Sequence, residues 1–365
     1  MVTSDALPST GGVQNVVWQL STAFAKEGHK VVALSPGQDG SSSWGSLTIE
    51  RAQLAPFSVR AWLRDPGLLF RGIGRFSKFL SSHRAEVLHL HSVGAEAFYA
   101  ALAARLRGIA VVATIHGFRD FGTLTWFGLL MERFTFLLCH VVTTCCEADR
   151  RGILSRHPML ASRIRTLPNG VDLAQIDALA GPNETGRVAF VGRLTKQKGL
   201  DILLQAWKIV ENATSGCQLI VAGNGPEEES LKKLERELDL KAVKWLGQLG
   251  PDEAISALTT SCIVCIPSRW EGMPLVALEG MGAGRALVTS EVDGLPEVVV
   301  QGETGLMVAK EDPVALANAL LALLTEPSRS AAFGAAGRRR VKEYFTWTRI
   351  SELYLEAYRD AGGLK

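Results

Sequence analysis

The sequence predicts an α/β protein with two doubly wound parallel sheets, one following the other along the chain. Short runs of Val, Ile and Leu alternate with amphipathic helical stripes, which is the pattern of parallel strands joined by crossover helices. The 365 residues are enough for two domains of ordinary size, each with its own core. A stretch rich in Pro, Gly and Asn between residues 167 and 186 separates the two periodic runs and indicates the seam.

The first half is expected to contain one early helix and four well-marked strands. An apolar stripe over residues 13–26 predicts a helix that ends at Gly28, since glycine commonly follows a helix. Runs rich in Val and Ile predict strands at 30–34, 87–91, 110–115 and 141–144. The polar residues that follow these runs are expected in loops at the strand ends.

The second half shows the alternation more regularly. We expect strands at 187–191, 218–222, 243–246, 262–266 and 286–289, and helices at 200–211, 227–238, 252–259 and 274–282. An amphipathic stretch at 345–358 predicts a last helix. The predicted domains are residues 1–170 and 171–344, with 345–365 as a C-terminal helical segment.

Composition is that of a folded globular protein, with 47% hydrophobic and 21% charged residues. The most apolar region, residues 125–146, is interrupted by charged side chains, so we expect no membrane-spanning helix. The chain start is neither basic nor followed by an apolar core, and the six cysteines lack the spacing of secreted disulfide proteins. We therefore expect a cytoplasmic protein with reduced thiols. Cys262 and Cys265 are interpreted as buried structural thiols, because positions three apart in a strand face opposite sides.

The most informative stretch is Arg269–Gly280, in which Glu271 and Glu279 flank a Gly-Met-Pro turn. Proline suits a first helical position, so a helix from Pro274 would leave Glu271 before it and place Glu279 inside it. Free backbone N–H groups around residues 273–276 would then form a phosphate site at the positive end of the helix dipole. Carboxylates accept hydrogen bonds from pairs of hydroxyls, so this arrangement suits a nucleotide-sugar. Alone, two glutamates at this spacing are more often solvated.

Two cations lie in a loop between a predicted strand and a predicted helix. Arg193 and Lys198 can both project from that loop and neutralise a diphosphate, whereas Lys196 is the weaker candidate. A departing diphosphate gains negative charge in the transition state, and preorganised cations stabilise that state selectively. Isolated cations of this kind are more often solvated.

Histidines mark the strand ends of the first half. His116 follows the strand at 110–115 and precedes a glycine, which places its imidazole at a strand terminus. His89 and His91 share one face of a strand and could mimic a metal pair, but no third ligand is in view. We interpret them as strand-end polar residues near an acceptor site. No Asp-x-Asp triplet occurs in the chain, so a metal-bridged diphosphate site is not predicted.

Three glycine- or asparagine-containing turns have weaker signals. Gly11 and Gly12 open the first helix, where glycine lets a backbone approach a phosphate closely. The turn at 223–225 resembles part of a dinucleotide fingerprint, but lacks the third glycine and the acidic residue, so we interpret it as loop structure. Asn169 precedes a glycine and could be an ordinary turn residue.

Together these motifs resemble glycosyltransferase family 4 along nearly the whole chain. The residues that carry the resemblance are Arg269–Gly280 with 283–298 and 302–306, the Gly-Arg-Leu-x-x-x-Lys-Gly type run around Arg193, and the Thr-x-His-Gly setting of His116. The resemblance implies an α/β GT-B fold: two facing Rossmann-like doubly wound domains with a cleft between them. It also implies that the C-terminal helix crosses back to the N-terminal domain; a helix confined to the second domain is the alternative.

The chain departs from the family at its first strand. Family members usually open with a full apolar strand before the glycine turn, whereas only residues 1–4 precede that turn here. Either the chain start is late or the strand is short. In both cases the central strand of the first sheet would be weakened.

The resemblance assigns a role to each residue of the second-half motif. Glu279 would bind the ribose hydroxyls, and Glu271 would bind the hydroxyls of the donor sugar. The backbone of Gly272, Met273, Pro274 and Leu275 would hold the diphosphate between them.

Further positions match the family pattern elsewhere. Arg193 and Lys198 would neutralise the leaving diphosphate in place of a divalent ion, and His116 would lie beside the donor sugar. Asn169 matches a hinge position, and Gly11 and Gly12 match the glycine turn at the donor phosphate. The family also implies retention of configuration without an enzymatic nucleophile, with a phosphate oxygen taking the acceptor's proton.

The sequence thus predicts a retaining, metal-independent glycosyltransferase without a bound cofactor. It would move a hexose-type sugar from a UDP- or GDP-linked donor to a saccharide or lipid-linked acceptor in polysaccharide, lipopolysaccharide or glycolipid synthesis. A nucleotide-sugar epimerase of the same fold is the first alternative, although it lacks this two-glutamate loop. An inactive subunit that binds nucleotide-sugar is the second, which the shortened first strand leaves open.

Acceptor-side evidence is limited to charge and aromatic patterning. Residues 1–172 hold 18 basic and 12 acidic side chains, whereas residues 173–365 hold 21 and 25. Basic residues interleave with Trp and Phe at 60–64 and 68–80, and further aromatics follow at 118–136. This pattern fits peripheral contact with an anionic membrane. It equally fits ordinary helix packing in which the arginines remain exposed to solvent. No nucleic-acid recognition module accompanies the charge.

Overall fold

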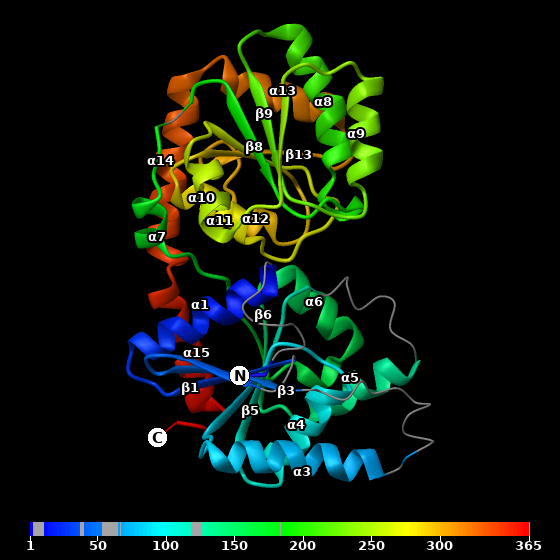
Figure 1. Ribbon diagram of the computed structural model, residues 1–365, viewed down its shortest axis with the longest axis vertical. Coiled ribbons are helices and arrows are strands. Elements are labelled where there is room, and N and C mark those ends of the chain that lie inside the picture. Colours follow the sequence, from blue (N-terminus) through cyan, green and yellow to red (C-terminus); the bar gives the residue numbers. More distant parts are fainter. Residues whose placement is uncertain are drawn as a thin grey trace. The chain divides into compact units, whose positions relative to one another are not determined.

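The computed structural model describes residues 1–2, 11–36, 40–52, 65, 67–117, 126–182 and 184–364 (Figure 1). Two compact units are present: Met1–Pro168 together with Trp347–Lys365, and Asn169–Thr346. Each unit is an α/β structure with parallel strands and helices on its sheet faces. Three parts of the predictions above lie outside the described residues: the turn before Gly11, the basic stretch at 60–64 and the aromatic residues at 118–125.

The first unit has two sheets among its described residues. The strands are β1 (Val31–Pro36), β2 (Gly40–Trp44), β3 (Leu47–Ala52), β4 (Val87–Leu90), β5 (Ala110–Ile115), β6 (Val141–Thr144) and β7 (Ile164–Thr166). One sheet has the order β1-β3-β2 and the other β4-β5-β6-β7. Val2 lies between them and bridges Leu34 of β1 and Leu90 of β4 in parallel. Val2 therefore connects the two sheets of this unit.

Strands β2, β3 and β7 were not predicted. β2 reads Gly-Ser-Ser-Ser-Trp, a sequence of low strand propensity that pairs only with β3, in antiparallel register. Its conformation comes from that pairing rather than from a local pattern. The other strands begin and end within two residues of their predicted bounds.

Helices cover the sheets of the first unit. They are α1 (Gly12–Lys26), α3 (Gly67–Ser82), α4 (Ala95–Arg105), α5 (Trp126–Leu138), α6 (Glu147–Arg156), the short η2 (Pro158–Leu160) and α15 (Trp347–Asp360). The last of these, α15, packs against α1, β5 and β6 of this unit (Figure 1). Its buried face includes Ile350, Tyr354 and Tyr358, so residues from both chain ends build one core.

The second unit has one six-stranded parallel sheet in the order β10-β9-β8-β11-β12-β13. The strands are β8 (Arg187–Val191), β9 (Gln218–Ala222), β10 (Val243–Gly247), β11 (Ile263–Ile266), β12 (Ala286–Ser290) and β13 (Gly305–Val308). The chain winds outward from β8 to β10, then returns to β11 beside β8 and winds the other way. Strand order therefore reverses between β8 and β11, which makes this edge the switch point of a doubly wound sheet.

The helices of the second unit include long ones, such as α8, that bury apolar residues in the core of the sheet. They are α7 (Leu173–Ala178), η3 (Lys196–Lys198), α8 (Leu200–Ala213), α9 (Glu228–Glu237), α10 (Pro251–Thr259), α11 (Leu275–Gly282), α12 (Leu295–Val298), α13 (Pro313–Leu324) and α14 (Pro327–Tyr344). Trp207 of α8 is fully buried, in one cluster with Val188, Val221 and Leu320. No described helix in either unit is long and apolar enough to cross a membrane.

Candidate active site

The switch point of the second unit brings two motif-bearing loops to the same edge of the sheet. The loop after β8 carries Arg193 and Lys198, and the loop after β11 carries Glu271. Because β8 and β11 are adjacent parallel strands, their carboxyl ends lie side by side. Residues separated by more than 70 positions in the sequence are thereby placed in contact.

Lys198 and Glu271 form an ion pair across these loops. The Lys198 Nζ lies 2.5 Å from Glu271 Oε1, and the Ser268 hydroxyl donates to the same oxygen at 2.6 Å. Glu271 is 5% exposed, and these partners offset the cost of burying its carboxylate. Its backbone N–H donates to the Asp293 carboxylate at 3.0 Å, which fixes the loop against the segment after β12. Ser268 and Asp293 were not singled out from the sequence, although both lie close to predicted residues or motifs.

The N-terminus of α11 lies immediately beyond Glu271. The prediction that Pro274 is the first helical residue is wrong by one position: its φ of −72° fits a helix but its ψ of 129° is extended, so it caps the helix and Leu275 begins it. Among the hydrogen bonds of the described residues, none uses the backbone N–H of Gly272, Met273, Leu275 or Val276. These donors at the positive end of a helix dipole can receive an anion.

Asn169, the first residue of the second unit, holds the segment before α11 in place. Its side-chain amide donates to the Met273 carbonyl at 2.8 Å, and the Asn169 side chain is buried. Asn169 therefore supports the loop that precedes α11. A ligand contact is not required to explain its position.

Glu279 has a different environment from Glu271. It lies in the second turn of α11 and is half-buried. Its backbone carbonyl accepts from the Ala283 N–H, but its carboxylate forms no hydrogen bond or ion pair with any described residue. Burial raises its pKa to about 7. A carboxylate held in this way without a partner is costly unless a ligand supplies hydroxyl donors.

Arg193 is exposed and makes no ion pair within the described part of the chain. Lys196 is also exposed, and only its backbone carbonyl takes part in the loop contacts, as an acceptor from Arg269. Of the three cations in this loop, Lys198 is the one that the fold itself holds against a carboxylate. Arg193 remains available to an anion.

The turn at residues 223–225 serves loop packing. A Cβ on Gly223 would lie 1.9 Å from the Gly192 carbonyl oxygen, and one on Gly225 would lie 2.3 Å from that of Leu194. Only glycine permits this approach, because a Cβ would clash with these carbonyl oxygens. The Leu194 N–H also donates to the Asn224 carbonyl at 2.8 Å, which joins the two segments. The turn thus supports the loop that carries Arg193 and Lys198.

In the first unit, His116 lies just beyond β5 as predicted. Its Nε2 is 3.1 Å from His91 Nδ1, its Nδ1 is 3.5 Å from Cys145 Sγ, and its ring stacks on that of His91. Burial lowers the pKa of His116 to about 4, so the imidazole is neutral at pH 7. Both ring nitrogens are occupied within this unit, which disfavours His116 as a general acid.

His89 and His91 are both buried, rather than lying at an exposed strand end. His89 Nδ1 is 2.7 Å from the Tyr358 hydroxyl, and its Nε2 is 2.7 Å from the Thr114 hydroxyl. Burial holds the pKa of both histidines well below the ordinary value. His89 thus joins α15 to the sheet of the first unit. Among the described residues, no group of three or more His, Cys, Asp or Glu side chains could hold a metal ion.

Gly11 and Gly12 form the start of α1. Gly11 is extended and caps the helix without a side-chain hydrogen bond, and the space beside Gly12 is open. At the start of α1 the Gln14 side chain lies against Gly11. The predicted approach of a donor phosphate to this turn stays a prediction.

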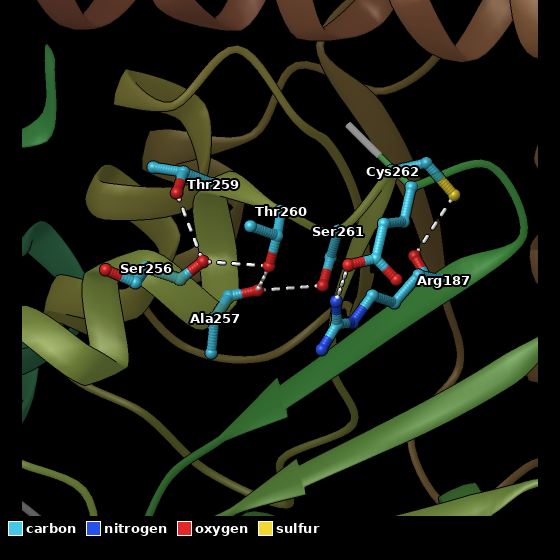
Figure 2. A network of polar contacts seen from close by, with 8 residues as sticks. Arg187, Ser256, Ala257, Thr259, Thr260, Ser261 and Cys262 are labelled. Atoms are coloured by element: carbon cyan, nitrogen blue, oxygen red, sulfur yellow. Dashed lines mark hydrogen bonds and ion pairs between the residues drawn. The ribbon is translucent and has the colours of Figure 1, made fainter. Parts of the chain in front are cut away.

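The cysteine pair of the second unit is structural. Figure 2 shows Cys262 at the end of a polar network in which hydroxyls of Thr260 and Ser261 donate to carbonyls of α10. The Cys262 thiol donates to the Arg187 carbonyl at 3.1 Å, and Cys265 is buried in the core. Both thiols are free.

Comparison with known protein families matches both halves of the chain. The family model described as Glycosyltransferase Family 4 matches residues 10–175, and the one described as Glycosyl transferases group 1 matches residues 174–340. The chain is 28% identical to a glycogen synthase of Mycobacterium tuberculosis, over 96% of this chain and 92% of that protein. It is 29% identical to a phosphatidyl-myo-inositol mannosyltransferase of Mycobacterium leprae, over 95% and 92%.

Solved structures show the same fold. Sucrose-phosphate synthase from Thermosynechococcus elongatus superimposes with a TM-score of 0.80 at 22% identity, covering 98% of this chain and 97% of that chain. HepE from Anabaena, crystallised with UDP and glucose, superimposes with a TM-score of 0.78 at 17% identity, with 98% of both chains covered. The two family models together span residues 10–340, and the chain therefore belongs to glycosyltransferase family 4, with the GT-B fold.

Proposed function

We propose that this glycosyltransferase is a retaining enzyme that moves a hexose-type sugar from a UDP- or GDP-linked donor without a metal ion. The carrying observation is the contrast along α11. Glu279 is a partly buried carboxylate without a partner, Glu271 is paired with Lys198, and unbonded backbone N–H groups lie between them. A ribose matches Glu279, a diphosphate matches the N–H groups, and a sugar matches Glu271.

The chemistry assigned to these groups is dissociation of the donor's anomeric carbon–oxygen bond. The diphosphate leaves with the bonding electrons, and Lys198, Arg193 and the start of α11 stabilise its growing charge. The acceptor hydroxyl attacks the same face of the sugar, and its proton passes to an oxygen of the leaving phosphate. Glu271 then accepts hydrogen bonds from sugar hydroxyls and stabilises positive charge on the ring. No step needs His116 to ionise.

The test is release of nucleoside diphosphate from a panel of UDP- and GDP-linked hexoses, with saccharide and lipid acceptors supplied. We expect one donor to be turned over without added divalent metal and in the presence of a chelator. The anomeric configuration of the product, read by NMR coupling constants, should equal that of the donor. An inverted product, or strict dependence on a divalent ion, would refute the corresponding part of the proposal.

The same assay separates the alternatives. An epimerase would convert one nucleotide-sugar into another without transfer to any acceptor. An inactive subunit would bind a nucleotide-sugar tightly, yet release no diphosphate with any donor. Either result would replace the transferase assignment.

A lipid-linked acceptor is the acceptor class with structural support. Helix α5 exposes Leu129, Leu130, Phe134 and Leu137 on one face, and the exposed Arg133 lies among them. Phe70 of α3 is 75% exposed, and α3 and α5 both pack on α4. Apolar side chains mixed with arginine suit the interface of an anionic membrane. The relative named as a phosphatidyl-myo-inositol mannosyltransferase is consistent with such an acceptor.

This contact predicts sedimentation with vesicles of mixed phosphatidylcholine and phosphatidylglycerol, and less with phosphatidylcholine alone. Replacing Leu130 and Phe134 by Ser should abolish sedimentation while diphosphate release with a soluble acceptor persists. A matched control is Val314→Ser, which removes an exposed apolar side chain from the second unit. Equal sedimentation of all variants would exclude the α5 face as the membrane contact.

A further inference from the structure

Arg269 lies two residues before Glu271 but does not pair with it. Its guanidinium makes a two-pronged contact with Asp201, at 2.9 Å to Oδ1 and 2.7 Å to Oδ2. Its Nε donates to Glu311 at 2.9 Å, and its Nη1 also donates to the Lys196 carbonyl at 2.7 Å. All three guanidinium nitrogens are therefore occupied outside the predicted ligand positions.

The position of Asp201 gives this pairing a consequence for Lys198. Asp201 lies three residues after Lys198, in the first turn of α8, with the left-handed Gly199 between them, so it is the carboxylate nearest to Lys198 along the chain. In the structure Lys198 instead pairs with Glu271, while Arg269 takes both carboxylate oxygens of Asp201. Burial opposes ionisation of Asp201, but the hydrogen bonds from Arg269 outweigh it and hold its pKa below the ordinary value.

We propose that Arg269 is a positioning residue for Lys198. By neutralising Asp201, Arg269 removes the charge of the carboxylate nearest to Lys198 along the chain, so that the Lys198 ammonium is directed to Glu271 and to the donor diphosphate. This inference rests on the proposed transferase function, in which Lys198 contacts the leaving group. It assigns a role to a charge pair that itself touches no substrate.

A simple tether between the loops is the competing explanation. The Arg269 N–H donates to the Gln197 carbonyl at 2.8 Å, and the Gln197 side chain donates to the Trp270 carbonyl at 3.1 Å. These contacts join the same loops without any side-chain charge on Arg269. Loss of a tether cannot be repaired by also removing Asp201, whereas loss of charge compensation can.

The experiment compares Arg269→Gln, Asp201→Asn and the double variant in the full-length protein. Arg269→Gln frees the Asp201 carboxylate to attract Lys198, so kcat/KM for the donor should fall roughly 10- to 100-fold. Neutralising Asp201 in the same chain should restore kcat/KM to within about 5-fold of wild type. The dissociation constant for the nucleoside diphosphate, measured by calorimetry, should rise in the single variant and recover in the double one.

The matched control is Arg338→Gln. Arg338 also contacts both carboxylate oxygens of an aspartate, Asp177, and a backbone carbonyl, that of Gly282, within the same unit. The Arg338→Gln variant should lose about as much thermal stability as Arg269→Gln, but keep kcat/KM within about 2-fold of wild type. An equal loss of activity in Arg338→Gln would overturn the proposal.

Three further outcomes bear on the proposal. A double variant no more active than Arg269→Gln would show that Arg269 acts only as a tether. If Arg269→Gln does not fold, Arg269→Lys keeps the charge beside Asp201 and should retain at least a third of wild-type kcat/KM; a larger loss would refute charge compensation. A wild-type protein that neither binds nucleotide nor releases diphosphate would instead refute the proposed function and leave the Arg269–Asp201 contact itself unexplained.

Discussion

At the residue scale, the two glutamates around α11 have opposite environments and should fail in different ways. Glu279 has no partner within the described chain, whereas Glu271 is held by Lys198 and Ser268. Glu279→Ala should weaken nucleoside diphosphate binding roughly 10-fold or more, because it would remove the acceptor for ribose hydroxyls. Glu271→Ala should mainly lower kcat, since the native glutamate is proposed to contact the reacting sugar. Calorimetry and steady-state kinetics on both variants check this, and equal losses of nucleotide affinity would reverse the assigned polarity.

Glu279 also gives a stability prediction whose sign follows from its pKa. The folded-state pKa is about 7 against an ordinary 4.5, so the folded protein keeps a proton that the unfolded chain has released between these values. Stability therefore falls as pH rises from about 4.5 to 7, and the loss is complete above pH 7. Glu279→Gln should raise the free energy of unfolding at pH 8 by on the order of 1–3 kcal/mol and change it little at pH 4.

Denaturant unfolding of the wild type and the variant at both pH values measures this difference. Glu303→Gln is a suitable control, because that side chain is exposed just before β13 and its carboxylate forms no hydrogen bond or ion pair with a described residue. A gain at pH 4 equal to that at pH 8 would show that the effect is not ionisation of Glu279.

At the element scale, the contact between the two site loops depends on one glycine. Gly199 ends η3 and begins α8 with φ of +65°, and a Cβ there would lie 2.1 Å from the Pro267 carbonyl oxygen. That carbonyl belongs to the loop that carries Glu271. The backbone approach, as well as the side-chain ion pair, sets the distance between Lys198 and Glu271.

Gly199→Ala should therefore separate the loops and reduce activity strongly. Gly247→Ala is the matched control, because Gly247 has φ of +69° with no heavy atom within 4 Å of the added Cβ. Both variants should lose about 1 kcal/mol of stability from the left-handed backbone, and Gly199→Ala should lose at least another ~1 kcal/mol from the clash. Thermal unfolding and donor kcat/KM together test this; equal activity of the two variants would show that the close approach is unimportant.

At the scale of the whole molecule, the first unit is built from two distant chain segments. Helix α15 supplies Tyr358 to His89, and the Tyr358 ring packs 5.5 Å from that of Phe24 in α1. The Ser351 hydroxyl also donates to Glu27. The second unit, by contrast, is one continuous segment, Asn169–Thr346, with its own core.

Removal of residues 347–365 should accordingly destabilise the first unit and leave the second folded. The truncated chain would expose the buried His89 without its Tyr358 partner, a loss of about 1–3 kcal/mol in addition to the lost apolar burial. We expect rapid proteolysis within residues 1–168, with a protected fragment close to 169–346 that still binds nucleoside diphosphate. Equal protease resistance of both units would show that α15 is not needed for the first core.

Local patterns were sufficient for the strands that lead into the site loops and for the residue types of the site. The predictions did not include helices α4, α5, α6, α13 and α14 or strand β13. The predicted bounds are correct for β5, β6, β8 and β9. Parallel strands that are buried on both faces have continuous apolar sequences, so their ends can be recognised. The edge strand β2 was missed, since its serines have no strand pattern of their own. The position of Pro274 was misjudged by one residue, because its φ fits both a cap and a first helical position.

The sequence by itself determined the doubly wound architecture, the loops that carry the charged residues, and the glutamates at the start of α11 and within it. Only the tertiary structure decided which charges meet. Strand order places β8 beside β11, so Lys198 pairs with Glu271 across 73 positions. Arg269 forms its ion pair with Asp201 instead. Spacing along the chain cannot encode such choices, because they depend on which carboxylates each cation can reach after the sheet has formed.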